Sequence, residues 1–202
     1  DPYGETSPEQ ILSDITGEWQ LIEQSLFNIP YYTTPILDFK VKKKKLVNLL
    51  KSYPEKKHGM QSFFTNRQSN RDGLVVGFTE LLSEELNMLT QKIKAGISVM
   101  DVWSVTYAKN DYHSPHNHGS TGLAGILYLD LPKDSPVTSY IQPWQDYVND
   151  TTIFNPLLVT EGEIVIVPQS VLHFSSPNKS TKKKRIISWD MNILPQGEDY
   201  CV

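Results

Sequence analysis

Histidine is the residue type in this chain whose spacing most clearly suggests chemistry. The chain contains five histidines; His116 and His118 stand two residues apart, and His173 follows at the end of a later predicted strand. Residues i and i+2 of an extended segment point to the same side, so His116 and His118 can bind one metal ion together, with His173 as a third ligand. Three protein ligands leave coordination positions open, which a catalytic metal needs. A His-x-His pair by itself would also fit a polar loop.

A strand with small residues and a tyrosine follows the histidine pair. With a period of two, Gly122, Ala124, Ile126 and Tyr128 share one face of this strand. Small residues near a metal leave room for a ligand, and Tyr128 offers a hydroxyl further along. Simple packing of a buried strand would explain the glycine and the alanine equally well, and the tyrosine less well.

A basic residue opens the last predicted strand. Arg185 follows His173 by twelve residues and shares a strand face with Ile187, Trp189 and Met191. If that face lines the interior of a barrel, Arg185 points inward. A buried guanidinium requires an anion, and a carboxylate matches its two-pronged geometry. A charged residue at the start of an apolar strand is otherwise usually a surface residue.

The elements that must position these residues are predicted from periodicity. The first part of the chain indicates a short helix from residue 8 to 15, a weak edge strand over 18–28, a helix capped by Asp38, and a longer helix capped by Thr79 and stopped by Gly96. Strands are predicted over residues 99–107, 122–131, 137–142, 163–168 and 185–194. Helices followed by short strands indicate an α+β fold. The strands would curl into a barrel or jelly roll, with the N-terminal helices packed on its outside.

Composition narrows the class of protein. The 202 residues carry a net charge of −4, so no concentrated basic face argues for nucleic acid. No apolar run is long enough for a membrane span, and the first residues lack the order of a signal peptide. The single cysteine, Cys201, excludes a disulfide within one chain. We expect a cytoplasmic protein with one domain over residues 1–202, mainly helical in 1–98 and with its β core in 99–194.

The order of these motifs resembles that of the 2-oxoglutarate/Fe(II) oxygenase superfamily. The shared order is a His-x-(Asp/Glu/His) pair, a strand with a tyrosine, a strand that leads to a histidine, and an arginine ten or so residues later. The corresponding segments here are residues 116–118, 123–129 and 162–173 and Arg185, with looser matches at Ser188 and Asn192. The chain looks most like small oxygenases with a His-x-His motif, and the resemblance covers roughly residues 99–194.

The chain also resembles prolyl-4-hydroxylases, in which a tyrosine about ten residues before the first metal ligand often contacts the cosubstrate. Tyr107 stands nine residues before His116. The resemblance implies a double-stranded β-helix in which the three histidines hold Fe(II). It also implies a 2-oxoglutarate cosubstrate whose distal carboxylate pairs with Arg185, helped by Tyr128 or Tyr107. The implied reaction hydroxylates a C–H bond and releases succinate and CO2.

One position departs from the superfamily pattern. Most members use a carboxylate as the second ligand, where this chain has His118. Three neutral imidazoles would leave the iron more positively charged, which should alter metal affinity and oxygen chemistry. Asp111, the nearby acid, lies on the wrong side of His116. His113 has odd spacing from His116, which favours a role beside the metal or toward the substrate.

Two other functions fit the same residues. A three-histidine metal dioxygenase or cupin-type enzyme would account for His118 without 2-oxoglutarate, and a non-catalytic binding module on the same fold would need no metal turnover. The substrate and the oligomeric state stay open. Four aromatic residues, Tyr140, Trp144, Tyr147 and Phe154, lie where this superfamily usually places substrate-facing loops, although aromatic residues there are often local packing.

Overall fold

The computed structural model of the protein describes residues 29–58, 62–67, 71–146 and 148–194. The predicted helix over 8–15 and the predicted strand over 18–28 lie outside the described residues. The helices are α2 (Phe39–Leu50), α3 (Asp72–Leu81) and α4 (Ser83–Ile93). The strands are β1 (Tyr32–Pro35), β2 (Lys56–Lys57), β3 (Phe64–Thr65), β4 (Gly96–Tyr107), β5 (His113–His116), β6 (Leu123–Asp130), β7 (Thr138–Ile141), β8 (Phe154–Pro156), β9 (Glu163–Pro168), β10 (His173–Ser175) and β11 (Lys184–Leu194).

The strands form two antiparallel sheets. The larger sheet has seven strands in the order β1-β9-β6-β11-β4-β3-β2, and the smaller has four in the order β5-β10-β7-β8. The central strand β11 pairs with β4 on one side and β6 on the other. In the smaller sheet, β10 lies between β5 and β7. The α+β class predicted from the sequence is confirmed.

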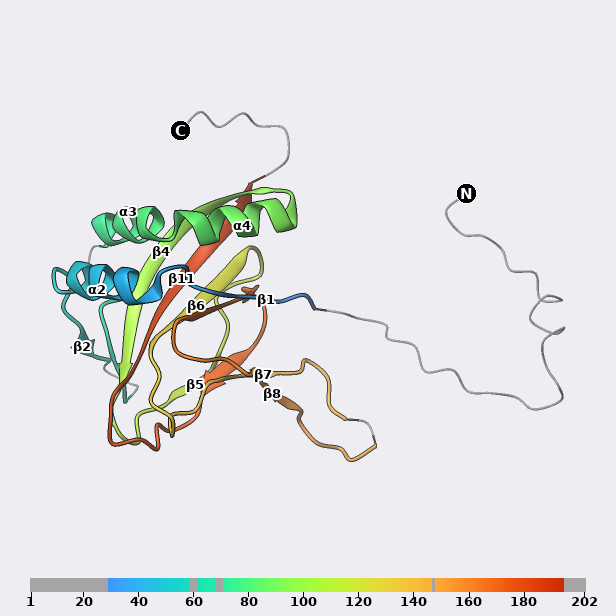
Figure 1. The fold of residues 1–202 in the computed structure, drawn as a ribbon. Coiled ribbons are helices and arrows are strands. Elements are labelled where there is room, and N and C mark those ends of the chain that lie inside the picture. The colour runs from blue at the N-terminus through green and yellow to red at the C-terminus, as the bar shows by residue number, and fades with distance from the viewer. Residues whose placement is uncertain (1–28, 59–61, 68–70, 147, 195–202) are drawn as a thin grey trace, which may run out of the picture.

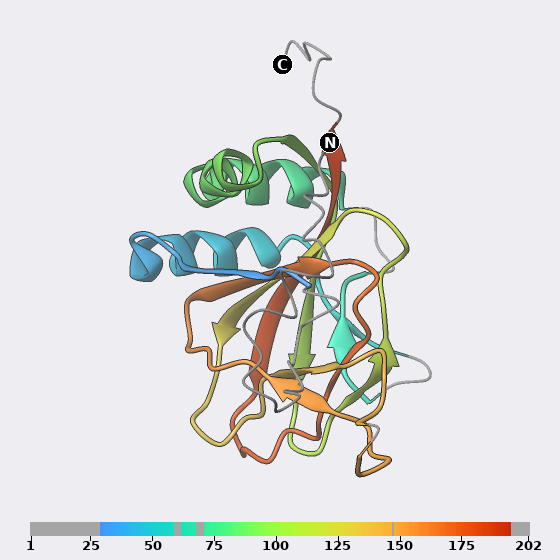
Figure 2. The ribbon, with the colours of Figure 1, turned by 90° about the vertical axis from the view of Figure 1, so that its right-hand side faces the viewer.

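The three helices gather on one face of the larger sheet (Figures 1 and 2). Leu46 and Leu50 of α2 and Phe78 of α3 are buried in one cluster with Trp189 of β11. The rings of Phe78 and Trp189 have centroids 5.0 Å apart. The predicted packing of helices on the outside of the strands is therefore observed. Among the described residues, no helix is both long and apolar enough to cross a membrane.

Strand β11 is buried on both of its faces. Ile187 and Trp189 belong to the cluster under the helices, whereas Ile186 belongs to a second cluster with Tyr107 and Tyr128 on the other face of the larger sheet. Successive residues of a strand point to opposite faces, so a strand covered on both sides reads as a nearly continuous apolar run. The face that carries Ile186 is the one that lines the site described below.

The long helix predicted from Thr79 is two helices in the structure. Thr79 lies inside α3, where its hydroxyl donates to the Val75 carbonyl oxygen at 2.8 Å. This bond to a carbonyl one turn earlier is how a threonine is accommodated within a helix. The two helices are separated at Leu82. Helix α4 ends at Ile93, and the residue that follows, Lys94, adopts a left-handed conformation with φ 55°. Gly96, predicted to stop the helix, begins β4 instead.

The first part of the chain also differs in detail from its prediction. Asp38 precedes α2 as expected, but it has φ 50° and its side chain makes no capping hydrogen bond. The spacing of Val41, Leu46 and Leu50 predicts that all three lie on the buried stripe of that helix, but Val41 is 55% exposed. The described part of the region predicted to be mainly helical, residues 1–98, also supplies β1, β2 and β3, which extend both edges of the larger sheet. Strands of two to four residues are too short to produce a detectable period.

Candidate metal centre

The three predicted histidines come together between the two sheets. His116 ends β5 and His173 begins β10, and the two are direct partners in the register of these strands. His118 lies just beyond β5, where its backbone N–H donates to the Gln169 carbonyl oxygen at 2.9 Å. One nitrogen atom of each of the three histidines lies within 4.8 Å of those of the other two. The arrangement can therefore enclose one metal ion.

Backbone carbonyl groups orient two of these rings. The Nδ1 atom of His116 lies 2.8 Å from the Ser114 carbonyl oxygen, and that of His173 lies 2.9 Å from the Val171 carbonyl oxygen. A carbonyl oxygen can only accept, so each Nδ1 must carry the proton and donate. The Nε2 atom of each ring is then left with a free lone pair. This is the tautomer that a metal-binding histidine needs.

A carboxylate orients the third ring. His118 Nδ1 lies 2.5 Å from Asp190 Oδ1, and the His118 side chain is only 2% exposed. A carboxylate behind a metal-binding histidine fixes the ring and makes it a more basic ligand. Arg67 lies 3.9 Å from the other Asp190 oxygen and its guanidinium covers the Trp103 ring at 4.2 Å. The negative charge of Asp190 thus lies next to His118, which occupies the sequence position where most of the superfamily has a carboxylate ligand.

Three histidines of the site, His113, His116 and His173, are neutral at ordinary pH. Burial, reinforced by the neighbouring histidines, lowers the pKa of His173 to about 3 and the pKa of His113 to about 2. Burial also lowers the pKa of His116. Neutral imidazoles keep their lone pairs available, so no proton has to be displaced before a metal ion binds.

His113 lies beside the three-histidine cluster. Its ring stacks on His116, with centroids 3.9 Å apart and planes 19° from parallel, and it contacts Phe63 on its other side at 4.3 Å. It does not belong to the group whose nitrogen atoms converge. The expected role of His113 as a neighbour of the metal site, rather than a ligand, fits this position.

Lys184 is the unexpected charged residue of the site. It is completely buried, and its Nζ donates to the Pro136 carbonyl oxygen and to Ser175 Oγ, both at 2.8 Å. The ammonium group also lies 4.7 Å above the Tyr107 ring. No acidic side chain of the described residues pairs with it, and burial lowers its pKa to about 7. A buried cation without an anion is costly, so this position favours an anionic ligand.

Arg185 does not point into this space, and the expectation that it does is corrected by the structure. Its Nε lies 3.6 Å from Asp130 Oδ2, and its side chain is 32% exposed. The face that Arg185 shares with Ile187 and Trp189 is the face covered by the helices. Because strand residues alternate, its neighbour Lys184 occupies the inner face instead.

Tyr107 and Tyr128 both lie on the inner face, as predicted. Tyr107 is 2% exposed and its hydroxyl is bonded to Ser175, which also accepts from Lys184. The Tyr128 hydroxyl accepts from the backbone N–H of Thr138 at 3.1 Å. Burial raises the pKa of both phenols, so both remain protonated. Tyr107 is therefore the one that reaches the group around Lys184.

A small cavity joins the histidines to this group. The three histidines, Tyr107, Thr138, Ser175, His113 and Arg67 are among the residues that line it. Its volume of about 20 Å³ is enough for roughly one water molecule. A larger ligand requires side chains to move, and the exposed Arg67 at the rim is the one with most freedom to do so.

The aromatic residues predicted to face a substrate separate into two groups. Tyr140 and Trp144 line a second, larger cavity. Phe154 is 53% exposed and its ring packs edge-on against Phe174, which is local packing. Tyr147 lies outside the described residues.

Comparison with known proteins identifies the fold. No family model matches the sequence, and no curated protein matches it. Among solved structures, an oxidoreductase of the 2OG-Fe(II) oxygenase family from Burkholderia pseudomallei has a TM-score of 0.63 at 7% identity, over 80% of this chain and 84% of that one. The chain has the fold of the 2-oxoglutarate- and iron(II)-dependent oxygenases.

Two further structures show the same fold. A prolyl-4-hydroxylase from Pseudomonas putida has a TM-score of 0.55 at 11% identity, over 81% of this chain and 93% of that one. HygX from Streptomyces hygroscopicus, solved with nickel and 2-oxoglutarate bound, has a TM-score of 0.60 at 8% identity, over 84% of each chain. The resemblance predicted from the histidine motifs is thus confirmed at the level of the 2-oxoglutarate oxygenase fold.

Sequence reasoning gave no role to Lys184, Asp190 or Arg67. The signal for the first two was weak: period two places Lys184, Ser188 and Asp190 on one face of the last strand, but it does not say whether that face or the one that carries Arg185 lines the site. Arg67 left no such signal, since it comes from a short loop in a different part of the sequence.

Proposed function

We propose that the protein is an Fe(II)- and 2-oxoglutarate-dependent oxygenase whose two sheets form a double-stranded β-helix. The observation that carries the proposal is the buried Lys184 beside the three-histidine cavity. Ser175, which accepts from Lys184, stands two residues after His173 on β10. Two residues of a strand span roughly 6.6 Å, which is comparable to the extended length of a five-carbon dicarboxylate.

The residues present fit both groups. The Nε2 atoms of His116, His118 and His173 would hold the iron, because each Nδ1 faces an acceptor. Lys184 would pair with the distal carboxylate of 2-oxoglutarate. Iron and 2-oxoglutarate bound together would, with dioxygen as the oxidant, supply the chemistry for C–H hydroxylation, with succinate and CO2 as the other products. The nickel and 2-oxoglutarate in HygX support this cofactor set.

The chain's own groups orient these ligands and exclude water. Asp190 fixes the His118 ring and places a negative charge next to the site. This charge partly replaces that of the carboxylate ligand found in most of the superfamily. The Tyr107 hydroxyl and the ammonium group of Lys184 both meet Ser175, and Tyr107 and Ser175 line the cavity together with the histidines. An ion pair formed there would be strong, because the surroundings exclude solvent.

The competing functions explain less. A three-histidine dioxygenase or cupin-type enzyme accounts for His118, but it leaves a fully buried lysine without an anion. A non-catalytic binding module explains neither the buried Lys184 nor the presence of a hydrogen-bond acceptor opposite the Nδ1 atom of each of the three histidine rings. Only the 2-oxoglutarate oxygenase uses both features.

An anaerobic titration tests the proposal. Fe(II) is added to metal-free protein, 2-oxoglutarate follows, and the visible spectrum is recorded. We expect a weak charge-transfer band that the His173→Ala variant lacks. The control variant His58→Ala changes a histidine that does not line the cavity, and it should retain the band. Fe(II) binding without the band would favour the cupin-type enzyme, and the absence of Fe(II) binding would favour the binding module.

A further inference from the structure

A second cavity lies next to the metal site, on the side of β7 and β8. It has a volume of about 440 Å³, within the range of small-molecule sites. It opens between the chain leading into β1 and the turn after β7, and its walls include Leu157, Val167 and Val171. None of the described residues that line it is charged. A charged group of a ligand would therefore have no partner inside it.

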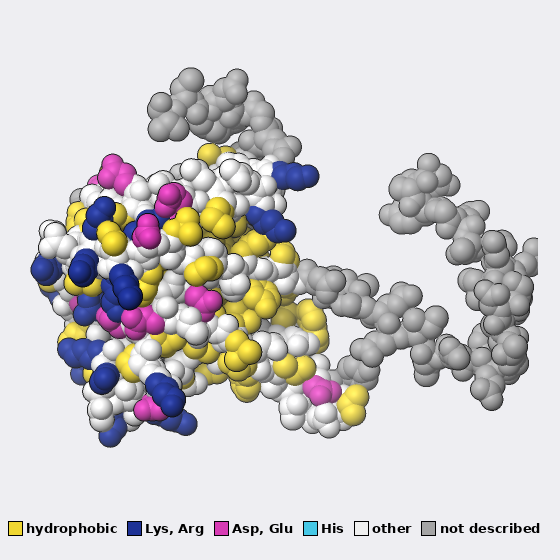
Figure 3. Space-filling model, in the orientation of Figure 1, with side chains coloured by type: hydrophobic (Ala, Val, Ile, Leu, Met, Phe, Trp, Pro, Cys, Tyr) yellow, Lys and Arg dark blue, Asp and Glu magenta, His cyan; other side chains and the backbone are white. Residues whose placement is uncertain are grey.

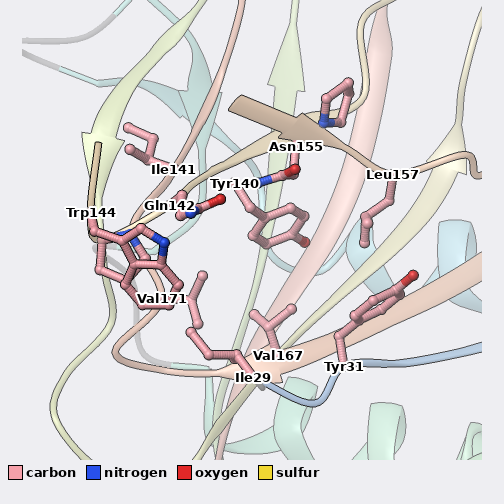
Figure 4. Close-up of a pocket in the computed structure, with 12 residues that line it drawn as sticks. Ile29, Tyr31, Tyr140, Ile141, Gln142, Trp144, Asn155, Leu157, Val167 and Val171 are labelled. Carbon is pink, nitrogen blue, oxygen red and sulfur yellow. The ribbon is translucent and has the colours of Figure 1, made fainter. Parts of the chain in front are cut away.

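Tyr140 is one of the uncharged polar residues that line this cavity, together with Gln142 and Asn155. Its side chain projects into the space that Trp144, Leu157 and Val167 surround (Figure 4). The residue is only 7% exposed, and its hydroxyl has no hydrogen-bond partner among the described residues. Leaving a buried hydroxyl unpaired is unfavourable. The hydroxyl is thus a donor for which the described residues supply no acceptor.

Aromatic side chains form the mouth of the cavity. Tyr31 is 54% exposed and Trp144 is 44% exposed, and they lie on different sides of the Tyr140 ring in Figure 4. Figure 3 shows hydrophobic side chains gathered on the part of the surface beside β1, while most Lys and Arg side chains lie toward the left of the view, away from β1. Ile29 contributes to the same apolar surface at 46% exposure. Exposed apolar surface that continues into a cavity is typical of a binding site.

The position of Tyr140 connects this cavity to the metal centre. Tyr140 and His173 are direct partners in the pairing of β7 with β10, and their ring centroids are 5.8 Å apart. A ligand that contacts the Tyr140 hydroxyl therefore lies beside a proposed metal ligand.

We propose that this cavity binds a neutral ligand that carries a ring-sized apolar group and a carbonyl or similar oxygen, and that the Tyr140 hydroxyl donates to that oxygen. This inference rests on the proposed function, in which the ligand of this cavity is the substrate of the oxygenase. The aromatic mouth and apolar walls take the ring, and the absence of charged lining residues selects against carboxylates and amines. Tyr140 determines which substrates are bound.

The test uses metal-free protein and three probes of similar size. Acetophenone has a ring and a carbonyl oxygen, ethylbenzene lacks the oxygen, and benzoate carries a charge. A heteronuclear NMR titration follows the indole N–H of Trp144. We expect saturable shifts with acetophenone, weaker binding of ethylbenzene, and no saturation with benzoate.

The Tyr140→Phe variant separates this proposal from mere apolar adsorption. It should bind acetophenone about five- to tenfold more weakly than wild type does, whereas its affinity for ethylbenzene should be unchanged. Its Tm should equal or exceed that of wild type, because an unpaired hydroxyl has been removed. The Tyr112→Phe control changes a tyrosine that does not line the cavity and should alter none of these values. Equal acetophenone affinity in Tyr140→Phe and wild type, a lowered Tm, or saturable benzoate binding would overturn the proposal. The NMR titration needs no metal, so it is independent of the Fe(II) titration. If the probes bind as expected but the iron charge-transfer band is absent, the proposed function is refuted and the binding of a neutral ligand in this cavity is not.

Discussion

Replacing Lys184 by methionine should weaken cosubstrate binding and yet stabilise the protein. The substitution keeps a long unbranched side chain and removes only the buried ammonium group. A hydrogen bond to a charged group contributes about 1.5–3 kcal/mol, so 2-oxoglutarate should bind the metal-loaded variant roughly 10- to 150-fold more weakly. Calorimetry under anaerobic conditions measures this directly.

The expected gain in stability follows from the pKa of Lys184. Burial lowers it from 10.5 to about 7, and each unit corresponds to about 1.4 kcal/mol. The buried ammonium therefore costs on the order of 4 kcal/mol at pH 7, part of which its bonds to Pro136 and Ser175 offset. We expect the methionine variant to be on the order of 2–4 kcal/mol more stable in urea unfolding at pH 7 in the absence of ligand.

The pH dependence of this gain has a definite sign. Between the folded pKa of about 7 and the unfolded value of 10.5, the unfolded chain binds more protons at Lys184 than the folded chain does. The stability of wild type therefore rises with pH across this window relative to the variant. The difference between the two proteins should be largest below pH 7 and should shrink as pH approaches 10.5.

The neighbouring arginine provides the matched control. Arg185→Met removes a partly exposed ion pair with Asp130, which is worth about 0–1 kcal/mol, and it should change 2-oxoglutarate affinity less than threefold. The reasoning is refuted if Arg185→Met loses 2-oxoglutarate while Lys184→Met retains it. A Lys184→Met protein that is less stable than wild type at pH 7 would refute the account of the buried charge.

The remaining predictions concern the metal and the titration of the site. His116→Ala and His173→Ala should each lose bound iron in a metal analysis while their circular dichroism stays that of wild type; unchanged iron content in both would show that the ligand assignment is wrong. Asp190→Asn removes the charge behind His118 and should weaken metal affinity about 10- to 100-fold, measured by competition with a chelator, and equal affinity would limit Asp190 to a structural role. The affinity for 2-oxoglutarate should fall, by up to about tenfold per pH unit, as pH rises above 7 and the Lys184 ammonium group is lost; a flat profile between pH 6 and 9 would exclude Lys184 as the anchor.

The metal site could be predicted from sequence because its geometry is local. Two histidines two residues apart need only an extended backbone to share a side, and the structure places His116 and His118 in that way. His173 was predictable because it follows a clear apolar strand. Asp190 was not, since its contact with His118 depends on which side of β11 faces the loop after β5.

The anchor could not be assigned from periodicity alone. Period-two alternation places Lys184 and Arg185 on opposite faces of β11 but does not say which face is inside. Both faces are buried, one under the helices and one between the sheets. The more apolar face, with Trp189 and Met191, resembles a barrel interior but packs against helices. Assigning the faces requires knowing where α2 and α3 lie, which is tertiary information.

A structure of the Mn(II) and 2-oxoglutarate complex, prepared without oxygen, tests the central claim most directly. We predict one metal ion with the Nε2 atoms of His116, His118 and His173 at about 2.0–2.2 Å. We also predict a distal carboxylate oxygen about 2.7–2.9 Å from Lys184 Nζ. A metal ion that lacks His118 as a ligand, or a 2-oxoglutarate whose distal carboxylate meets Arg185, would contradict the account.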